Sequence, residues 1–443
     1  MSMDWVATTL GAVSTWASGG TPKKDEASYW NGDIPWISAN SMHVTRFSES
    51  DLMITETGLK SGSRLALRDT VLLLVRGSAL HSRMPVGIAL RDVAFNQDVK
   101  AITAKSDAIR PWYLLYWLMG NERFLLDTVV EYTGIGAGKL DTKRMQGLDL
   151  LLPPLREQDE ILQVIRSVDD RITLLRETNA TLEAIAQALF KSWFVDFDPV
   201  RAKMEGRAPE GMDEATAALF PDALEESELG WVPKGWRIGQ VADLGNVVCG
   251  KTPPTSVPEN YGVDVPFITI PDMHDLLVVT TTARSLSKVG ADSQAKKYLP
   301  PGAICVSCIA TPGLVVRVTT TAQTNQQINS VIPLKKWGDA FPLFLLRRIG
   351  DAVRSGGSGG SVFHNLSKSG FEQLPVLLTA PELADRFSAV VEPLVGRIVA
   401  NQEQAQTLST LRDTLLPRLI SGQLRLPEAE AATEAALGGA LHA

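Results

Sequence analysis

Residues 154–194 contain two interleaved series of mostly apolar positions, each recurring every seven residues. The alternating spacing of four and three is typical of the seam of a coiled coil. Such a seam predicts one long helix that must bury its apolar face against another helix. The d series is Ile161, Val168, Leu175, Leu182 and Leu189, and the a series is Ile165, Ile172, Asn179, Ala186 and Trp193.

The same pattern returns 226 residues later, so the chain supplies the second helix itself. Its d series is Phe387, Leu394, Asn401, Leu408 and Leu415, and its a series is Val391, Ile398, Ala405, Arg412 and Leu419. We predict antiparallel packing in the register that places Asn179 opposite Asn401. In that register the two amides satisfy each other, whereas a slipped register buries both without a partner. Arg412 then faces Val168 and must reach solvent or an acid such as Asp169 or Asp170.

The segments between the helices are duplicated as well. Residues 34–37 (IPWI) are echoed by 265–268 (VPFI), the run at Val71 by the run at Ala303, and Asn96-Gln97 by Asn325-Gln326. The runs 71–75 and 86–90 predict buried strands, and Pro111 opens a predicted helix. We therefore predict an α+β fold: two duplicated mixed α/β domains separated by two long antiparallel coiled-coil helices, with pseudo-twofold symmetry. The predicted boundaries are domains at 1–152 and 236–379, helices at 153–195 and 380–425, an acidic Pro/Gly-rich linker at 196–235, and a disordered tail at 426–443.

Charge is distributed unevenly along the 443 residues, whose formal net charge is −7. Residues 195–230 hold 3 basic and 10 acidic side chains, whereas residues 231–380 hold 14 and 9. The acidity is thus concentrated in the linker, and the domains are neutral and basic, which permits contact with phosphates. Three cysteines, no apolar run of membrane-spanning length and no export signal predict a cytoplasmic protein.

Segment 76–83 (RGSALHSR) is the strongest candidate DNA-reading loop in the first domain, because arginine can bond guanine O6 and N7 bidentately. An ordinary charged surface loop is the alternative interpretation. The glycine-rich segments 134–138 and 355–360 fit either a contact loop or a plain connector. Candidate DNA-binding residues are Arg76, His81, Arg83, Lys139, Lys143, Arg144, Lys251, Lys288, Lys296, Lys297, Arg317, Arg354 and Lys368.

Two motifs point to other chemistry. Residues 245–252 (GNVVCGKT) match the phosphate-binding P-loop pattern, but Pro253 and Pro254 oppose the helix that such a loop must open. The pair Cys305 and Cys308 has no second ligand pair nearby, so two buried free cysteines are favoured over a zinc site. We find no catalytic constellation, and we predict that the chain is not an enzyme and binds no metal or cofactor itself.

Two stretches resemble the specificity subunits of Type I restriction–modification enzymes. They are residues 152–158 (LPPLREQ), which lead into the first long helix, and residues 191–207 (KSWFVDFDPVRAKMEGR) with 233–236 (PKGW). The second helix departs from the pattern, because it begins with PEL at 381–383 and contains Pro393. That departure leaves the straightness of its first turns open.

The resemblance implies two target-recognition domains that each read one half of a bipartite DNA site. It also implies that two methyltransferase subunits, which hold S-adenosylmethionine and methylate adenine, dock on this chain. Two restriction subunits, which use ATP and Mg, would join through them for host defence. The seam from Ile161 to Trp193 would span about 48 Å as a helix, so the helix pair could act as a ruler between half-sites. A P-loop nucleotide-binding protein and a scaffold without a DNA role are the alternatives.

Overall fold

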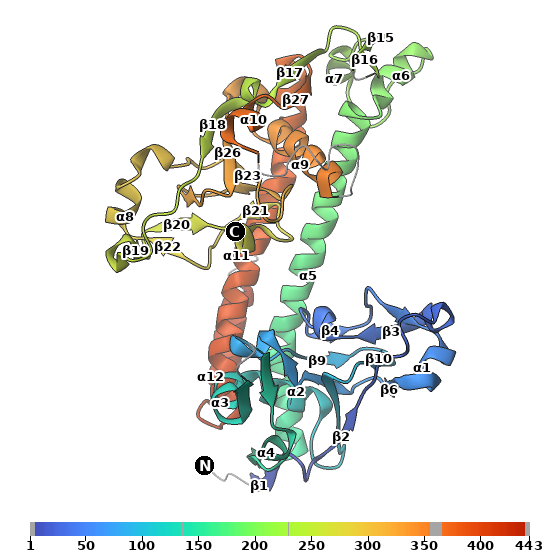
Figure 1. Ribbon diagram of the computed structural model, residues 1–443, viewed down its shortest axis with the longest axis vertical. Helices are drawn as coiled ribbons and strands as arrows, with labels where there is room; N and C mark the ends of the chain where they lie inside the picture. Colours follow the sequence, from blue (N-terminus) through green and yellow to red (C-terminus); the bar gives the residue numbers. More distant parts are fainter. Residues whose placement is uncertain (1–4, 134–136, 229, 355–365, 439–443) are drawn as a thin grey trace. The chain divides into compact units, whose positions relative to one another are not determined.

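The computed structural model describes residues 5–133, 137–228, 230–354 and 366–438, and it divides into two compact units (Figure 1). Unit 1 comprises Met1–Ile172 and Gln406–Ala443, and unit 2 comprises Thr173–Ala405. The two long helices, α5 (Leu155–Phe194) and α11 (Pro381–Ile420), each contribute to both units. In the described residues, we find no helix with the length and apolarity that crossing a membrane requires.

The domain of unit 1 is built on a mixed five-stranded sheet. Val71–Leu74 is fully buried, as the apolar run predicted. Helix α2 (Pro111–Gly120), with its predicted proline in the first turn, packs against this sheet through Leu114 and Leu118. The strand order is β2 (Ser14–Ser18), β11 (Val99–Ala104), β7 (Val71–Leu74), β9 (Val86–Ala89) and β4 (Arg46–Phe47).

Three smaller sheets complete this domain. The first has the order β5 (Met53–Ile54), β3 (Trp30–Ile37), β10 (Val93–Phe95) and β6 (Arg64–Ala66). The second has the order β12 (Val130–Thr133), β13 (Ala137–Leu140) and β8 (Arg76–Gly77). In the third, β1 (Val6–Thr9) pairs with β14 (Asp149–Leu152) just before α5 begins.

The domain of unit 2 repeats the five-stranded sheet and the pairing of the first and last strands of unit 1, which confirms the duplication predicted from the sequence. Its five-stranded sheet has the order β18 (Gly245–Cys249), β26 (Ile328–Pro333), β23 (Ile304–Ser307), β24 (Val315–Val318) and β21 (Val278–Val279). Its four-stranded sheet has the order β19 (Tyr261–Gly262), β22 (Ser285–Leu286), β20 (Val265–Ile268) and β25 (Gln323–Thr324). β17 (Arg237–Gln240) pairs with β27 (Pro375–Leu378) before α11, and α9 (Ala340–Arg354) takes the place of α2.

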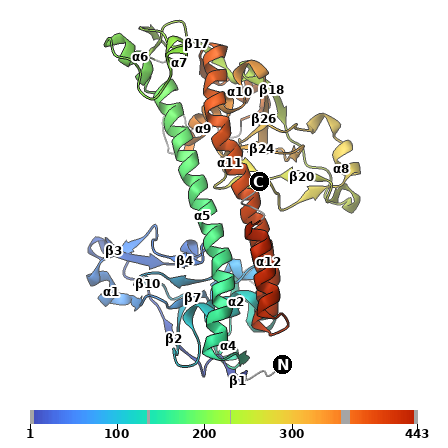
Figure 2. The ribbon, with the colours of Figure 1, turned by 180° about the vertical axis from the view of Figure 1, so that it is seen from behind.

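The seam of the helix pair is apolar and largely buried within each unit, where α5 and α11 lie side by side (Figures 1 and 2). In unit 1 the buried seam residues are Ile161, Ile165, Val168, Ile172, Leu408, Leu415 and Leu419; in unit 2 they are Leu175, Ala186, Trp193, Phe387, Val391, Ile398, Asn401 and Ala405. Leu182, Leu189 and Leu394 are partly buried. α11 is unbroken despite Pro393.

The two predicted polar contacts of the seam are confirmed. In unit 2, Asn401 Nδ2 donates to Asn179 Oδ1 at 2.9 Å. In unit 1, Arg412 Nη1 donates to Asp169 Oδ1 at 2.7 Å, and Asp169 Oδ2 also accepts from the Tyr116 hydroxyl. The amide pair thus lies in the register that we predicted from the sequence.

The acidic Pro/Gly-rich linker predicted at 196–235 contains regular secondary structure. It contains a short helix, α7 (Glu214–Ala218), capped by Asp213. Helix α6 (Asp198–Met204) and a hairpin of β15 (Leu224–Ser227) and β16 (Gly230–Pro233) were not predicted. Apolar linker residues such as Phe197 and Phe220 are buried against the end of α5, and this tertiary contact orders the segment.

The prediction of a disordered tail is wrong for residues 426–438. They form helix α12 (Leu426–Gly438), in which Ala429 is fully buried in the core of unit 1. Alanine and glutamate have high helix propensity, and a buried apolar contact is enough to fix such a helix.

The P-loop interpretation is also wrong. Residues Gly245–Cys249 form β18, which pairs with β26 along its whole length, and no helix begins at Lys251 or Thr252. Gly250 is required because a Cβ there would lie 2.0 Å from the Asn325 carbonyl oxygen. The glycine is therefore explained by close backbone packing and not by a bound phosphate.

Cys305 and Cys308 are buried free thiols. Burial raises the pKa of Cys305 to about 12 and that of Cys308 to about 11. Among the described residues, no three His, Cys, Asp or Glu side chains cluster in a way that could hold a metal ion.

Candidate nucleic-acid interface

In unit 1, a row of exposed charged side chains lies on one face of the three-stranded sheet β12–β13–β8. Lys139 is directly opposite Arg76 on one side and Glu131 on the other. All three side chains are exposed. Because directly opposed residues share one face of a sheet, they form a row across the three strands. We call this row, Glu131–Lys139–Arg76, the reading row.

The inner face of the same sheet is covered by the 3-10 helix Ser78–His81. A Cβ on Gly138 would lie 2.7 Å from Leu80 Cβ, so only glycine leaves room for this helix. The Tyr132 hydroxyl donates to the Leu80 carbonyl at 3.3 Å, and the Tyr132 ring stacks on His81 with centroids 4.8 Å apart. The sequence-predicted residues Arg76, His81 and Lys139 thus belong to one built element, to which the structure adds Glu131 and Tyr132.

The other candidates of unit 1 lie apart from the reading row. Arg83 is exposed and borders a cavity of about 410 Å³ together with Glu122 and Arg123. Lys143 and Arg144 are exposed on α4 (Thr142–Gln146), whose N-terminus is capped by Asp141. Residues 134–136 and 355–360 of the two glycine-rich segments lie outside the described residues.

Several candidates of unit 2 are engaged with acids of their own domain. Lys288 donates to Asp292 at 3.0 Å, and this hydrogen bond to the carboxylate raises the pKa of Lys288. Lys368 pairs with Glu372, and Arg354 pairs with Asp351 and donates to the Gly313 carbonyl. Among the described residues, no acid forms an ion pair with Lys251, Lys296 or Lys297. Lys251 and Lys296 are exposed.

Arg317 is not a surface residue, and its assignment to DNA binding was wrong. It is only 9% exposed and pairs with Glu392 of α11 at 2.6 Å. β24 is buried along its whole length, so an arginine within it needs an acid from the packed helix.

Sequence reasoning missed one polar contact that both domains share. Thr21 Oγ1 donates to Gln97 Oε1 at 2.6 Å, and Thr252 Oγ1 donates to Gln326 Oε1 at 2.6 Å. Each pair joins the segment after the first strand of the five-stranded sheet to the turn before the second strand. In unit 1 this pair borders a cavity of about 570 Å³ that is lined by both aromatic and polar side chains, among them Trp30, Trp36, Lys24 and Asn40. The repeated Asn-Gln dipeptide was the signal that could have found it.

One protein-family model matches this chain at two places. The family model described as the Type I restriction modification DNA specificity domain covers residues 2–184 and again residues 233–415. The chain belongs to this family. Each match takes in one domain and most of the helix that follows it, as the duplicated topology requires.

Individual relatives agree with the family assignment. This specificity subunit is 36% identical over 364 residues to the Type I restriction enzyme HindI specificity subunit of Haemophilus influenzae, covering 73% of this chain and 79% of that one. It is 26% identical to the MjaIX specificity subunit of Methanocaldococcus jannaschii, covering 96% and 94%. The crystal structure of the S subunit from M. genitalium shares the fold, with a TM-score of 0.53 at 12% identity over 94% of this chain and 96% of that one.

Proposed function

We propose that each domain of this specificity subunit reads one half of a bipartite DNA site. The duplicated layout carries the proposal: two domains built on the same five-stranded sheet each precede one long helix. Two copies of one reading module give two half-sites, and the sequence between them is then not read. The exposed reading row supports a role in unit 1, since arginine and lysine bond guanine and glutamate accepts from cytosine.

The helices, in this proposal, set the spacing between the half-sites and carry the partners. A 40-residue helix is about 60 Å long, which exceeds one turn of duplex DNA at about 34 Å. Two methyltransferase subunits dock on this chain and methylate adenine with S-adenosylmethionine. Two restriction subunits that use ATP and Mg join through them. This chain determines which DNA site the complex recognises and does not catalyse the reaction, and it acts in the cytoplasm.

The decisive experiment is a domain replacement in the complex with its methyltransferase subunits. Residues 236–378 would be replaced by the matching domain of a relative with a different DNA target, and methylated adenines would be mapped across a genome. The proposal expects one half of the recognised site to change while the other half and the spacer length stay the same. A site that changes in both halves, or in neither, contradicts the assignment of one half-site to each domain.

A further inference from the structure

In both domains, an exposed glutamine lies in the turn that leads into the second strand of the five-stranded sheet. It is Gln97 in unit 1, shortly before β11, and Gln326 in unit 2, shortly before β26. The Thr21 hydroxyl donates to Gln97 Oε1 and the Thr252 hydroxyl donates to Gln326 Oε1, each at 2.6 Å. The same two residue types therefore make the same contact in both domains.

The backbone of this turn is held by bonds that do not involve the threonine. In unit 1, Asn96 Oδ1 accepts from the Asp98 amide at 3.0 Å, and in unit 2, Asn325 Oδ1 accepts from the Gln327 amide at 3.1 Å. Both asparagines are buried. An exposed side-chain hydrogen bond adds little to the stability of a turn that is already fixed in this way. What the threonine fixes is the orientation of the glutamine amide.

An amide held in this orientation is suited to the edge of an adenine. Glutamine reads adenine bidentately, because Oε1 accepts from the N6 amino group and Nε2 donates to N7. The threonine hydroxyl uses one of the two lone pairs of Oε1 and leaves the other lone pair and both Nε2 protons to a base. A side chain that is oriented before binding loses less conformational entropy when it binds.

In unit 1, Gln97 borders a cavity that has room for the edge of a base pair. The cavity has a volume of about 570 Å³, and its other walls include Trp30, Lys24 and Asn40. Lys24 and Asn40 are exposed, and Trp30 is partly exposed. The cavity thus combines an aromatic side chain, a second amide and a cation, which are groups that contact bases and phosphates.

This cavity adjoins the reading row through one backbone bond. Asp98 lines the cavity, and its carbonyl oxygen accepts from the Val75 amide at 2.8 Å. Gln97 precedes Asp98, and Arg76 of the reading row follows Val75. Each of the two side chains is one residue away from this bond, so neighbouring base pairs of one half-site can reach both.

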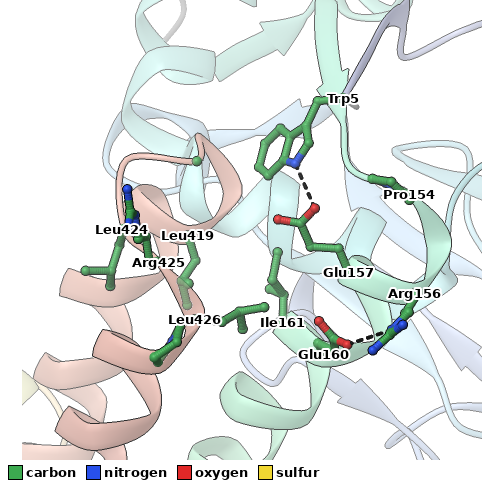
Figure 3. A pocket seen from close by; sticks show the side chains of 12 residues that line it. Trp5, Pro154, Arg156, Glu157, Glu160, Ile161, Leu419, Leu424, Arg425 and Leu426 are labelled. Atoms are coloured by element: carbon green, nitrogen blue, oxygen red, sulfur yellow. Dashed lines mark hydrogen bonds and ion pairs between the residues drawn. The ribbon is translucent and has the colours of Figure 1, made fainter. Parts of the chain in front are cut away.

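Another cavity of unit 1, between the start of α5 and the turn that follows α11, has a different character (Figure 3). There Trp5 Nε1 donates to Glu157 Oε2 at 3.0 Å, and Arg156 pairs with Glu160 at 3.0 Å. The polar groups of these four side chains are engaged with one another, and two of the four are carboxylates, which repel phosphates. The cavity beside Gln97 is therefore the better candidate for contact with DNA.

The internal repeat separates what the two sites share from what differs. The segments that hold the two threonines align without a gap, and they place Asn40 at the position of Pro271. In the same way, Arg76 after β7 corresponds to Ile309 after β23. The threonine–glutamine pair is thus common to both domains, while the neighbouring polar side chains of unit 1 are replaced by apolar ones. Two domains that read one base in common and other bases that differ need this combination.

We propose that Gln97 and Gln326 are equivalent specificity-determining residues, each of which reads an adenine at the same place in its own half-site. Thr21 and Thr252 are positioning residues, because they act through the glutamines. The inference rests on the proposed function, in which each domain reads one half-site.

The test uses this chain in complex with its methyltransferase subunits and measures binding to a DNA library in which every base pair of both half-sites is varied. Gln97→Ala should weaken binding to the preferred site about 5- to 150-fold and should relax the preference for adenine at one position of one half-site. Gln326→Ala should do the same at the equivalent position of the other half-site. Each variant is the matched control for the other, since the half-site of the unaltered domain should be read as before. Gln240→Ala, at an exposed glutamine of β17 outside the turn, should change neither preference.

Thr21→Val removes the hydroxyl that holds Gln97 Oε1 and keeps the shape of the side chain. It should lower the discrimination at the adenine position of the same half-site by about 5-fold and leave the other positions unchanged. A lower melting temperature with equal loss of binding to every library member would assign the pair a structural role and overturn the proposal. Retention of both adenine preferences in Gln97→Ala and Gln326→Ala also overturns it.

The replacement of residues 236–378 separates this inference from the proposed function. If that replacement changes one half-site while both glutamine variants keep their base preferences, the glutamine assignment is wrong and the division into two half-sites stands. If Gln97→Ala changes the preference in both half-sites, the assignment of one half-site to each domain is wrong, and this inference fails with it.

Discussion

Asn401 Nδ2 donates to Asn179 Oδ1 at 2.9 Å, and Asn179 Nδ2 donates to the Ile398 carbonyl oxygen at 3.1 Å. Asn401 is only 2% exposed. The two amides satisfy each other, and within unit 2 the other seam positions are apolar. A shift of either helix by one heptad would leave each amide opposite an apolar side chain, so the pair selects one register.

Replacing one member of this pair should therefore cost more than replacing both. Asn179→Leu leaves the buried Asn401 amide without its partner and should lower the free energy of unfolding by about 1–3 kcal/mol. Asn179→Leu with Asn401→Leu should recover most of that loss, because two leucines pack in a seam. Urea unfolding of the single and double variants measures the coupling. Gln163→Leu, at an exposed amide of α5, is the control and should change stability little. Additive losses in the double variant would contradict the facing pair.

The ion pair of Arg412 with Asp169 is the corresponding polar contact of unit 1, and its side chains are 17% and 12% exposed. Arg412→Leu removes the guanidinium that faces the buried Asp169 carboxylate, which also accepts from the Tyr116 hydroxyl, and it should cost about 3–5 kcal/mol. Adding Asp169→Asn removes the charge and should restore part of the stability. Arg156→Leu breaks an ion pair whose arginine is 91% exposed and should cost less than about 1 kcal/mol. Equal losses for the two arginines, in thermal or urea unfolding, would show that burial does not decide the effect.

Asp213 gives a contact of the linker with a defined pH dependence. The backbone amide of Thr216 and the Arg386 guanidinium lower the pKa of Asp213 to about 2. Because its pKa is depressed in the folded state, this carboxylate stabilises the fold above the unfolded-state pKa of about 4. The contribution is lost as the pH falls through about 2. Asp213→Asn should therefore lower the melting temperature at pH 7 and have progressively less effect below about pH 4. A difference between the two proteins that stays constant from pH 7 to pH 3 would contradict this assignment.

The sequence was sufficient to predict the helix pair because the apolar repeat is a local signal and the two amides favour one register over the others. A seven-residue apolar repeat has one structural solution, and two buried amides within it have one favourable register. Arg412 likewise could be assigned an acid, since Asp169 lies on the facing turn. Buried strands of the domains could be predicted for a similar reason. A short run as apolar as 71–75 is expected to be buried on both faces of a sheet.

The failures all concern residues whose environment is created by distant parts of the chain. Arg317 looks like any surface arginine until Glu392, 75 positions later, is seen to pack against it. The linker is acidic and rich in proline, but Phe220 finds an aromatic surface on α5 that composition does not reveal. The alanine- and glutamate-rich composition of the tail fits both a helix and a disordered segment. The burial of Ala429 in the core of unit 1 favours the helix, and composition does not reveal that contact.

The proposed spacing role of the helices can be tested by lengthening both of them. One heptad inserted between Leu175 and Asn179, with one inserted opposite it between Asn401 and Ala405, preserves the seam and adds about 10 Å. This length corresponds to about three base pairs. The methylase complex should stop methylating sites with the original spacing, and any remaining methylation should fall on sites with longer spacers and unchanged half-sites. Unaltered methylation of the original sites would refute the spacing role.

The reading row makes a prediction about unit 1 alone. Arg76→Ala should weaken specific DNA binding by the methylase complex about 5- to 150-fold, which corresponds to about 1–3 kcal/mol, and should relax the base preference at one position of one half-site. If Lys139 contacts a phosphate, Lys139→Ala should weaken binding to all sequences and reduce the salt dependence by about one ion. Arg68→Ala removes an arginine of the same domain that is 74% exposed and lies outside the row, so it is the matched control. Binding measured against a library of half-site variants at several salt concentrations separates these outcomes. Equal effects of Arg68→Ala and Arg76→Ala would show that the reading row contributes only general electrostatic attraction. A changed base preference in the half-site read by the other domain would show that the row is not the reading element of unit 1.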